Sequence, residues 1–461
     1  MRRPRQDEPD ARSAALTILD RIGRAGDHSN TLLAQLPAAM DSRDRALATE
    51  LVYGVLRRRT ALDRIIERFA TRELAAIEPL VLDILRLSLY QIVYLTRVPV
   101  PAAVNEAVSL ARARRGERAA GFVNGVLRSA ARQLADGGLV LPPQAFDATG
   151  ASGLPTDLEE VHSFPSFLVR RFVTRYGRVG ASDLMAALNR PAPVVLRSAA
   201  PGGGTDLIRR LADEGIRATL SPWLPEAVRV EQGQVQHSAT FRQGACYFQD
   251  EASQMVAHLL RPLQAGEGFL DLCAAPGGKF LAVAATRPAD PGPLVAADLS
   301  RERLQRMRRN AVRLGAGPFH SVVLDATRPA LRRRFGRVLL DAPCSGTGII
   351  RRHPEIRWRR SEAEIARLVD RQGVMLRAAC DLVAPGGRLV YAVCSLEPEE
   401  GPDRVAEMVA ARRDIELLNA RTLLPPGAQR LIDRSGYVAT LPHRDDLDGF
   451  FAAVLRRASD G

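Results

Sequence analysis

Lysine is nearly absent from this chain of 461 residues. Of its 65 lysine and arginine residues, only Lys279 is a lysine, and it lies in the stretch FLDLCAAPGGKF at residues 269–280. Arginine presents a planar fork of donors, whereas lysine places a compact ammonium on a flexible stem. Position 279 therefore keeps lysine in a chain that otherwise uses arginine, which suggests that this loop needs an ammonium group.

Cysteine is scarce as well. The five cysteines are odd in number, far apart and without a C-x-x-C pair, which argues against a disulfide framework and against a zinc site. Isolated thiols are typical of proteins in a reducing compartment. We therefore expect a cytoplasmic protein without a metal site. The cysteines are Cys246, Cys273, Cys344, Cys380 and Cys394.

Long apolar runs are also missing. The most apolar stretch, LVLDILRLSLYQIVYL, is interrupted by Asp83 and Arg86, which argues against a membrane span. The first residues, MRRPRQDEPDARS, include basic side chains but no apolar segment, so we predict no signal peptide.

Acidic residues are outnumbered by basic ones. The chain has 52 acidic residues, a formal net charge of +13 and a pI near 10.4. This balance predicts a polyanionic partner, with nucleic acid ahead of an anionic membrane. The alternative is an arginine-rich proteome in which the charge serves no specific partner.

The pattern of apolar residues predicts several domains. Apolar residues at helical spacing, without strand signals, predict an all-α domain at residues 1–140. A stretch rich in glycine and proline predicts a linker at residues 141–163. Mixed helical and strand patterns predict a small α+β subdomain at residues 164–245.

Residues 246–461 alternate between strand and helix patterns, which predicts an α/β domain with a doubly wound parallel sheet. The predicted strands are GFLDLC (268–273), PLVAADL (293–299), HSVVLDA (320–326), RVLLDAP (337–343), RLVYAVC (388–394) and FFAAVLR (450–456).

The turn after the first of these strands is CAAPGGK, residues 273–279. Its two glycines allow the backbone to approach a ligand closely, but Phe280 after the lysine excludes a P-loop. The next two strands end in Asp298 and Asp325, where an acid can bind ribose hydroxyls. Each aspartate alone is more often a helix cap or a turn residue. Together, the three features favour an adenosyl cofactor.

The fourth and fifth strands each end near a cysteine. Asp341 and Cys344 follow the fourth strand, and Cys394 follows the fifth. If these strands are neighbours, about 4.8 Å apart, both thiols face one pocket. A thiolate that adds to C6 of a pyrimidine makes C5 nucleophilic enough to accept a methyl group. Asp341 near N3 and the ammonium of Lys279 would assist this chemistry, but spacing alone does not order the two cysteines.

Three stretches, DLCAAPGGK, DAPCSGTGIIRRHPEIRW and VYAVCSLEPEE, closely resemble motifs of the RsmB/Sun (NOL1/NOP2/Sun) family of RNA cytosine-5 methyltransferases. The resemblance covers residues 164–461. Residues 10–132 are similar to the NusB fold, most clearly in NEAVSLARARRGERAAGFVNGVLRSAA. The resemblance implies a Rossmann-like sheet that binds S-adenosylmethionine and methylates C5 of a cytosine in RNA. The pairing with a NusB-like domain implies small-subunit (16S) rRNA.

The resemblance also assigns roles by position. Cys394 is the nucleophile, Cys344 assists release of the methylated RNA, and Asp341 lies between cofactor and cytosine. Two positions depart from the family pattern: Phe280 replaces the usual Thr or Ser, and Gly401 stands where Asn commonly follows PEE. The residues implied to bind the cofactor are Cys273, Ala274, Ala275, Pro276, Gly277, Gly278, Lys279, Asp298, Arg303, Asp325 and Asp341.

Two rival interpretations remain. DNA cytosine-5 methyltransferases have Gln after the Pro-Cys pair and a Glu-Asn-Val triplet, and this chain has neither arrangement at its PCS motif. The second rival is an RNA-binding antitermination or ribosome-assembly factor with an inactive methyltransferase domain. The loop at residues 273–279, Asp341 and both cysteines are all present, which argues against an inactive methyltransferase domain.

We expect RNA as the partner, no membrane association and a monomer. The arginine-rich stretch after the fourth strand is hypothesised to contact RNA phosphates, with Trp358 stacking or packing; a solvated loop is the alternative. Its arginines are Arg351, Arg352, Arg357, Arg359 and Arg360.

Overall fold

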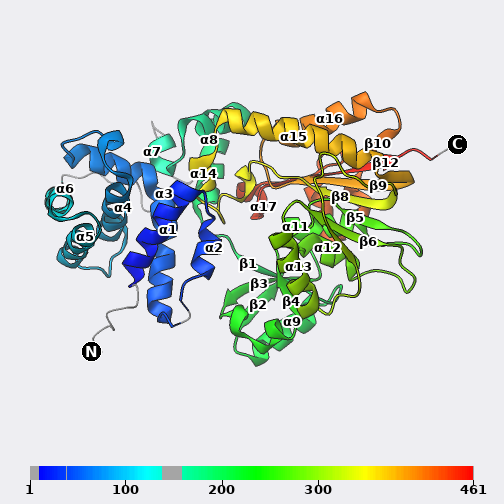
Figure 1. Cartoon of the computed structure of the whole chain (residues 1–461), viewed down its shortest axis with the longest axis horizontal. Helices are drawn as coiled ribbons and strands as arrows, with labels where there is room; N and C mark the ends of the chain where they lie inside the picture. Colours follow the sequence, from blue (N-terminus) through cyan, green and yellow to red (C-terminus); the bar gives the residue numbers. More distant parts are fainter. Residues whose placement is uncertain (1–9, 38, 138–157, 460–461) are drawn as a thin grey trace. The chain divides into compact units, whose positions relative to one another are not determined.

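The computed structural model describes residues 10–37, 39–137 and 158–459 (Figure 1). The chain divides into two compact units. The first contains residues 1–190 and 350–359, and the second contains residues 191–349 and 360–461. Most of the predicted linker lies outside the described residues. The four-part division expected from the sequence stays a prediction.

The described part of the first unit is helical, as the apolar periodicity predicts. Asp10 caps the first helix by accepting from two backbone N–H groups, and the start of another helix has Pro79 at its first position. The α-helices are α1 (Ala11–Ala25), α2 (Ser29–Ala34), α3 (Ser42–Phe69), α4 (Pro79–Tyr94), α5 (Val100–Arg115), α6 (Glu117–Ala135), α7 (Leu158–His162), α8 (Ser166–Asn189) and α14 (Ile356–Arg359).

Close packing in this unit depends on a small residue in α3. A Cβ on Gly54 would lie 2.0 Å from the Tyr90 ring, so only glycine lets α3 and α4 approach as they do. Tyr90 then donates to Glu50 Oε1 at 2.5 Å, which satisfies the hydroxyl inside the packed interface.

The second unit begins with a small antiparallel sheet in the order β2-β3-β1-β4, against which α9 (Gly204–Asp213) packs. The stretches APVVLRSA and EAVRVEQ predict β1 and β3, whereas no pattern in the sequence predicts the other two strands. The strands are β1 (Val194–Ser198), β2 (Arg217–Leu220), β3 (Ala227–Gln232) and β4 (Cys246–Phe248).

The larger sheet has the order β10-β12-β9-β8-β5-β6-β7, with β11 paired to β12. The strands from β9 to β7 are parallel, and β12 is antiparallel to β9. This arrangement confirms the predicted α/β fold class. The strands are β5 (Phe269–Asp271), β6 (Leu294–Asp298), β7 (His320–Val323), β8 (Phe335–Asp341), β9 (Val383–Val393), β10 (Ile415–Leu418), β11 (Val438–Thr440) and β12 (Phe450–Arg457).

Helices cover both faces of this sheet, because its central strands are apolar on both sides. Figure 1 shows α11 (Glu251–Leu260), α12 (Gly278–Ala284) and α13 (Arg301–Arg313) on one face. It shows α15 (Glu362–Asp381) and α16 (Pro402–Ala411) on the other. The connections run outward in opposite directions from β5 and β8, and a parallel sheet opens a crevice at such a switch point.

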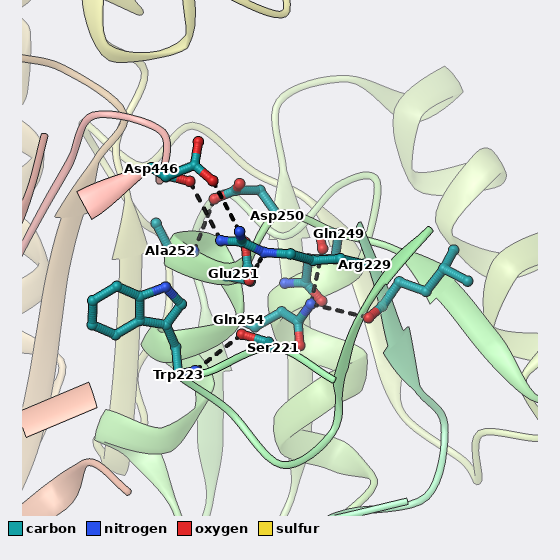
Figure 2. Close-up of polar contacts among 10 residues, drawn as sticks. Ser221, Trp223, Arg229, Gln249, Asp250, Glu251, Ala252, Gln254 and Asp446 are labelled. Carbon is teal, nitrogen blue, oxygen red and sulfur yellow. Dashed lines mark hydrogen bonds and ion pairs between the residues drawn. The ribbon is translucent and has the colours of Figure 1, made fainter. Parts of the chain in front are cut away.

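A buried ion pair ties the small sheet to the larger one. Arg229 of β3 donates to both oxygens of Glu251 at the start of α11, at 2.8 and 3.2 Å (Figure 2). The same guanidinium donates to Asp446 Oδ2 at 2.9 Å in the loop before β12. The carboxylate of Glu251 is fully buried, so it depends on these donors.

Among the helices of the described residues, none is both long enough and apolar enough to cross a lipid bilayer.

Candidate active site

The carboxyl ends of adjacent strands bring the predicted residues to one edge of the larger sheet. Asp271 ends β5, Asp298 ends β6 and Asp341 ends β8. Cys394 follows the last residue of β9, and Asp341 is in register with Ala392 of that strand. The predicted adjacency of the fourth and fifth strands is confirmed.

The two cysteine thiols lie against each other. The Sγ atoms of Cys344 and Cys394 are 3.4 Å apart, and both residues are partly exposed. Contact with Cys394 and burial raise the pKa of the Cys344 thiol well above its ordinary value, with the charge of Glu400 adding to the effect. The neighbouring Cys394 therefore makes the thiolate form of Cys344 less favourable.

Lys279 reaches the same pocket from the first residues of α12. Its Nζ donates to Asp341 Oδ2 at 2.7 Å and lies 5.5 Å from the centre of the Phe450 ring. Burial lowers the pKa of Lys279, but the carboxylate of Asp341 and the charge of Cys394 outweigh burial and raise it. The ammonium form of Lys279 is therefore favoured beside Asp341 and Cys394.

The loop at residues 273–279 makes a sharp turn into α12. Gly277 has φ of 107°, a conformation that favours glycine, and a Cβ there would lie 2.8 Å from Met307 Cγ. No side chain caps this helix start. Gly277 therefore allows this sharp turn between β5 and α12.

Asp298 and Arg303 lie against this loop. Asp298 accepts from Ala275 N at 3.2 Å and from Ser300 N at 2.9 Å. Arg303 donates to Ala275 O and lies 3.6 Å from Asp298 Oδ2. Asp325 accepts from the backbone and hydroxyl of Thr327 instead, and is joined to none of these residues by a hydrogen bond.

Asp271 is a site residue that the sequence analysis missed. It is buried, and burial together with the charge of Asp341 raises its pKa to about 8. Asp271 ends a strand, as Asp298 does, and this position could have identified it from the sequence. Burial raises the pKa of Cys273, and the charges of Asp271, Asp341 and Asp298 raise it further.

These contacts test whether the site suits S-adenosylmethionine, which carries a sulfonium and an ammonium. Asp298 and Asp341 lie close to the loop and can attract these cationic groups, and a bound cation would in turn favour the ionised form of Asp271. The charged side chains around this loop therefore fit S-adenosylmethionine.

Glu400 is a second residue that the sequence analysis missed. It is fully buried and accepts hydrogen bonds from Ser345 and Ser395, the residues that follow the two cysteines. No periodicity or strand end marks it in the sequence, because its partners lie 55 and 5 residues away.

The hypothesis that the arginine-rich stretch contacts RNA is wrong for its buried arginines. Arg351 is buried, and Arg357 is fully buried. Arg357 donates to Ser163 O and to Asn189 Oδ1, at 3.1 and 2.7 Å, and stacks on Phe164. These groups are enclosed by helices, so they cannot reach a phosphate.

The rest of the stretch is also engaged with protein groups. Trp358 donates to Leu56 O at 2.8 Å and packs against the helical core of the first unit. Arg359 donates to Gly26 O at 2.7 Å, and Arg360 donates to Ser345 O at 2.7 Å. Residues 350–359 thus complete the first unit. RNA contact by the partly exposed Arg352, Arg359 and Arg360 stays a prediction.

One group of possible metal ligands occurs among the described residues: His28, His353 and Glu355. Glu355 already accepts from Ser29 N at 3.0 Å and from Ser29 Oγ at 2.8 Å, so it caps α2. The expectation of no metal stays a prediction.

Comparison with protein families gives three matches along the chain. Residues 257–456 match the family described as 16S rRNA methyltransferase RsmB/F. Residues 9–132 match the NusB family, and residues 164–236 match a ferredoxin-like domain described as RsmF/B-like.

One relative matches over nearly its whole length. A Bacillus subtilis (strain 168) protein called "Probable ribosomal RNA small subunit methyltransferase B" is 32% identical over 453 residues, which cover 97% of this chain and 98% of the relative.

Solved structures share the fold. The crystal structure of PH0851 has a TM-score of 0.79 at 22% identity and covers 99% of this chain and all of its own. The structure of NSun6 from Pyrococcus horikoshii with SFG has a TM-score of 0.56 at 22% identity and covers 64% of this chain and 99% of its own.

Proposed function

Since the chain belongs to the RsmB/F family of 16S rRNA methyltransferases, we propose that it transfers a methyl group from S-adenosylmethionine to C5 of a cytosine in 16S rRNA. The observation that carries the proposal is the pair of thiols 3.4 Å apart beside a charged lysine and a carboxylate. Attack on a pyrimidine ring needs one soft nucleophile, and restoring the ring needs a base close to it.

The residues that would hold the cofactor are the loop at residues 273–279, Asp298 and Arg303, with Asp325 at the next strand end. When bound, S-adenosylmethionine supplies the methyl group as an electrophile. An analogue, SFG, is present in the structure of the Pyrococcus horikoshii NSun6, which supports a cofactor site in this fold.

Cys394 begins the reaction as a thiolate. Its Sγ forms a bond to C6 of the cytosine, and the electron pair of the C5–C6 double bond becomes available at C5, which gains the methyl group. Asp341 and Lys279, which are joined by a hydrogen bond, would stabilise the charge that develops on the ring. The ammonium of Lys279, whose pKa the charge of Cys394 helps to raise, would stabilise this thiolate.

Cys344 completes the reaction by taking the proton from C5. The electrons of the C5–H bond then re-form the double bond, and the C6–S bond breaks to return the Cys394 thiolate. Contact with Cys394 is the leading cause of the raised pKa of Cys344. That contact changes once Cys394 has become a thioether, so Cys344 becomes easier to ionise when a base is required.

Two cysteine variants test this division. Cys394→Ala should abolish methylation and form no RNA adduct. Cys344→Ala should form the thioether and accumulate as a protein–RNA adduct on a denaturing gel, because only the elimination step lacks its base. Bisulfite sequencing of the 16S rRNA product of the wild type should show a protected cytosine.

The double variant is the control and should form no adduct. An adduct trapped by Cys394→Ala and not by Cys344→Ala would reverse the two roles. Absence of methyl transfer by the wild type, with the cofactor bound, would favour the inactive RNA-binding alternative.

A further inference from the structure

Glu400 is a buried carboxylate that takes no part in the steps above. It ends the short helix η4 (Pro398–Glu400), which follows the Cys394 loop, and its side chain has no exposure to solvent. An ionised carboxylate in such a place is stable only if hydrogen-bond donors replace the lost water.

The donors come from the loops that hold the two cysteines. Ser345, next to Cys344, donates its backbone N–H to Oε1 at 2.8 Å and its hydroxyl to Oε2 at 2.5 Å. Ser395, next to Cys394, donates its hydroxyl to Oε2 as well. One carboxylate therefore joins both loops, and the two serine oxygens lie 3.0 Å apart across it.

Two further residues fix this carboxylate. Gln372 of α15 donates from Nε2 to Glu400 Oε1 at 2.9 Å and to Pro343 O at 2.8 Å, just before Cys344. Tyr391 of β9 donates to the backbone oxygen of Glu400 at 2.6 Å. The site is therefore anchored to a helix and to a strand, which are rigid elements.

We propose that Glu400 is a positioning residue that holds Cys344 against Cys394 for the release step. The proposal rests on the function proposed above. Glu400 takes two hydrogen bonds from Ser345 and one from Ser395, so it constrains the Cys344 loop more strongly. A misplacement of about 1 Å at a reacting group can cost roughly 10²-fold in rate.

Glu400→Gln is the decisive variant, because no orientation of an amide accepts from all four side-chain and backbone donors. We expect kcat to fall about 10- to 100-fold. The KM for RNA and the affinity for S-adenosylmethionine should stay within about threefold, since the cofactor loop is not part of this network. The RNA adduct should accumulate, as in Cys344→Ala.

Glu251→Gln is the matched control. Glu251 is an equally buried glutamate of the same unit, but its partner is Arg229 in the small sheet (Figure 2). This variant should melt at a lower temperature while keeping kcat and forming no adduct. If Glu400→Gln behaves like this control, or loses kcat without an adduct, Glu400 does not position Cys344.

If Glu400→Gln does not fold, Ser345→Ala is the variant that tests whether Glu400 positions Cys344. It removes one hydrogen bond to the carboxylate and keeps the backbone one, so the fold should survive. An adduct on this variant supports the proposal, and its absence overturns it. Cys344→Ala, measured in parallel, distinguishes the role of Glu400 from the roles of the two cysteines. If Cys344→Ala traps no RNA, the proposed roles of the cysteines are wrong.

Discussion

Lys279 occupies a position where charge and shape both matter. Its side chain is 14% exposed, and its Nζ donates to Asp341 while facing the Phe450 ring. A compact ammonium fits between a carboxylate and an aromatic face, but a planar guanidinium needs more room. This geometry explains why position 279 has lysine rather than arginine.

Lys279→Arg should therefore be more harmful than a charge-conserving change suggests. We expect kcat to fall about tenfold or more, because a larger group in a packed pocket displaces its neighbours. Steady-state methylation and a cofactor-binding titration would measure it. Turnover within about twofold of wild type would mean that the lone lysine is an accident of composition.

At this scale the sequence predicts most of the candidate residues at the ends of the parallel strands, although it misses Asp271. Asp298, Asp341 and Cys394 are found because parallel strands deliver their carboxyl ends to one edge. Glu400 is not found, because what makes it important is burial beneath loops that meet only in the folded protein. Burial of this kind has no signature in a single sequence.

Among the elements, the regular helices and central strands are predictable from periodicity, whereas several short strands are not. β5, β6, β8 and β9 form where apolar runs predict them, but β10 has only four residues and little pattern. The segment at residues 350–359 is the clearest failure. Its arginines resemble a solvated surface, yet Arg357 is buried by partners 168 and 194 residues away.

Residues 350–359 also contain a carboxylate, Glu355, whose stabilising effect we expect to be lost in acid. Glu355 is fully buried, but the imidazoles of His28 and His353, whose Nδ1 atoms lie 3.6 and 3.5 Å from Oε1, outweigh the effect of burial and lower its pKa. A carboxylate with a lowered pKa stabilises the fold above its unfolded pKa and loses that effect as the pH falls. Glu355→Gln should therefore lower the melting temperature at pH 7 by several degrees, and by less near pH 3, below the unfolded pKa.

Thermal melts at the two pH values would measure this difference. Glu364→Gln offers a control, since Glu364 pairs with Arg360 at a partly exposed position and should have a small effect. An equal loss for Glu355→Gln at both pH values would contradict a stabilising ionised carboxylate.

For the whole molecule, the net charge of +13 predicts that RNA affinity depends steeply on salt. A chain that starts at Ser163 should keep its affinity for S-adenosylmethionine, because the cofactor loop belongs to the second unit. It should melt at a lower temperature than the full chain, since Trp358 loses its contact with Leu56. It should also bind long rRNA more weakly, with a shallower dependence on salt.

Cofactor titration, melting and RNA binding at several salt concentrations would test these three expectations on the same preparation. A shortened chain that melts like the full one would show that the segment at residues 350–359 does not need the helices. An unchanged salt slope would assign the RNA contacts to the second unit alone.

The division of the first unit between residues 1–190 and 350–359 also bears on the order in which the protein is made. A domain at the start of a chain commonly folds while the ribosome is still translating the rest. Here the helices emerge first, but their last ten residues follow only after position 349. At about 5–20 residues per second, the helices wait on the order of ten seconds or more for the segment that completes them. Translation speed through the catalytic half of the gene therefore sets when the amino-terminal half can finish folding.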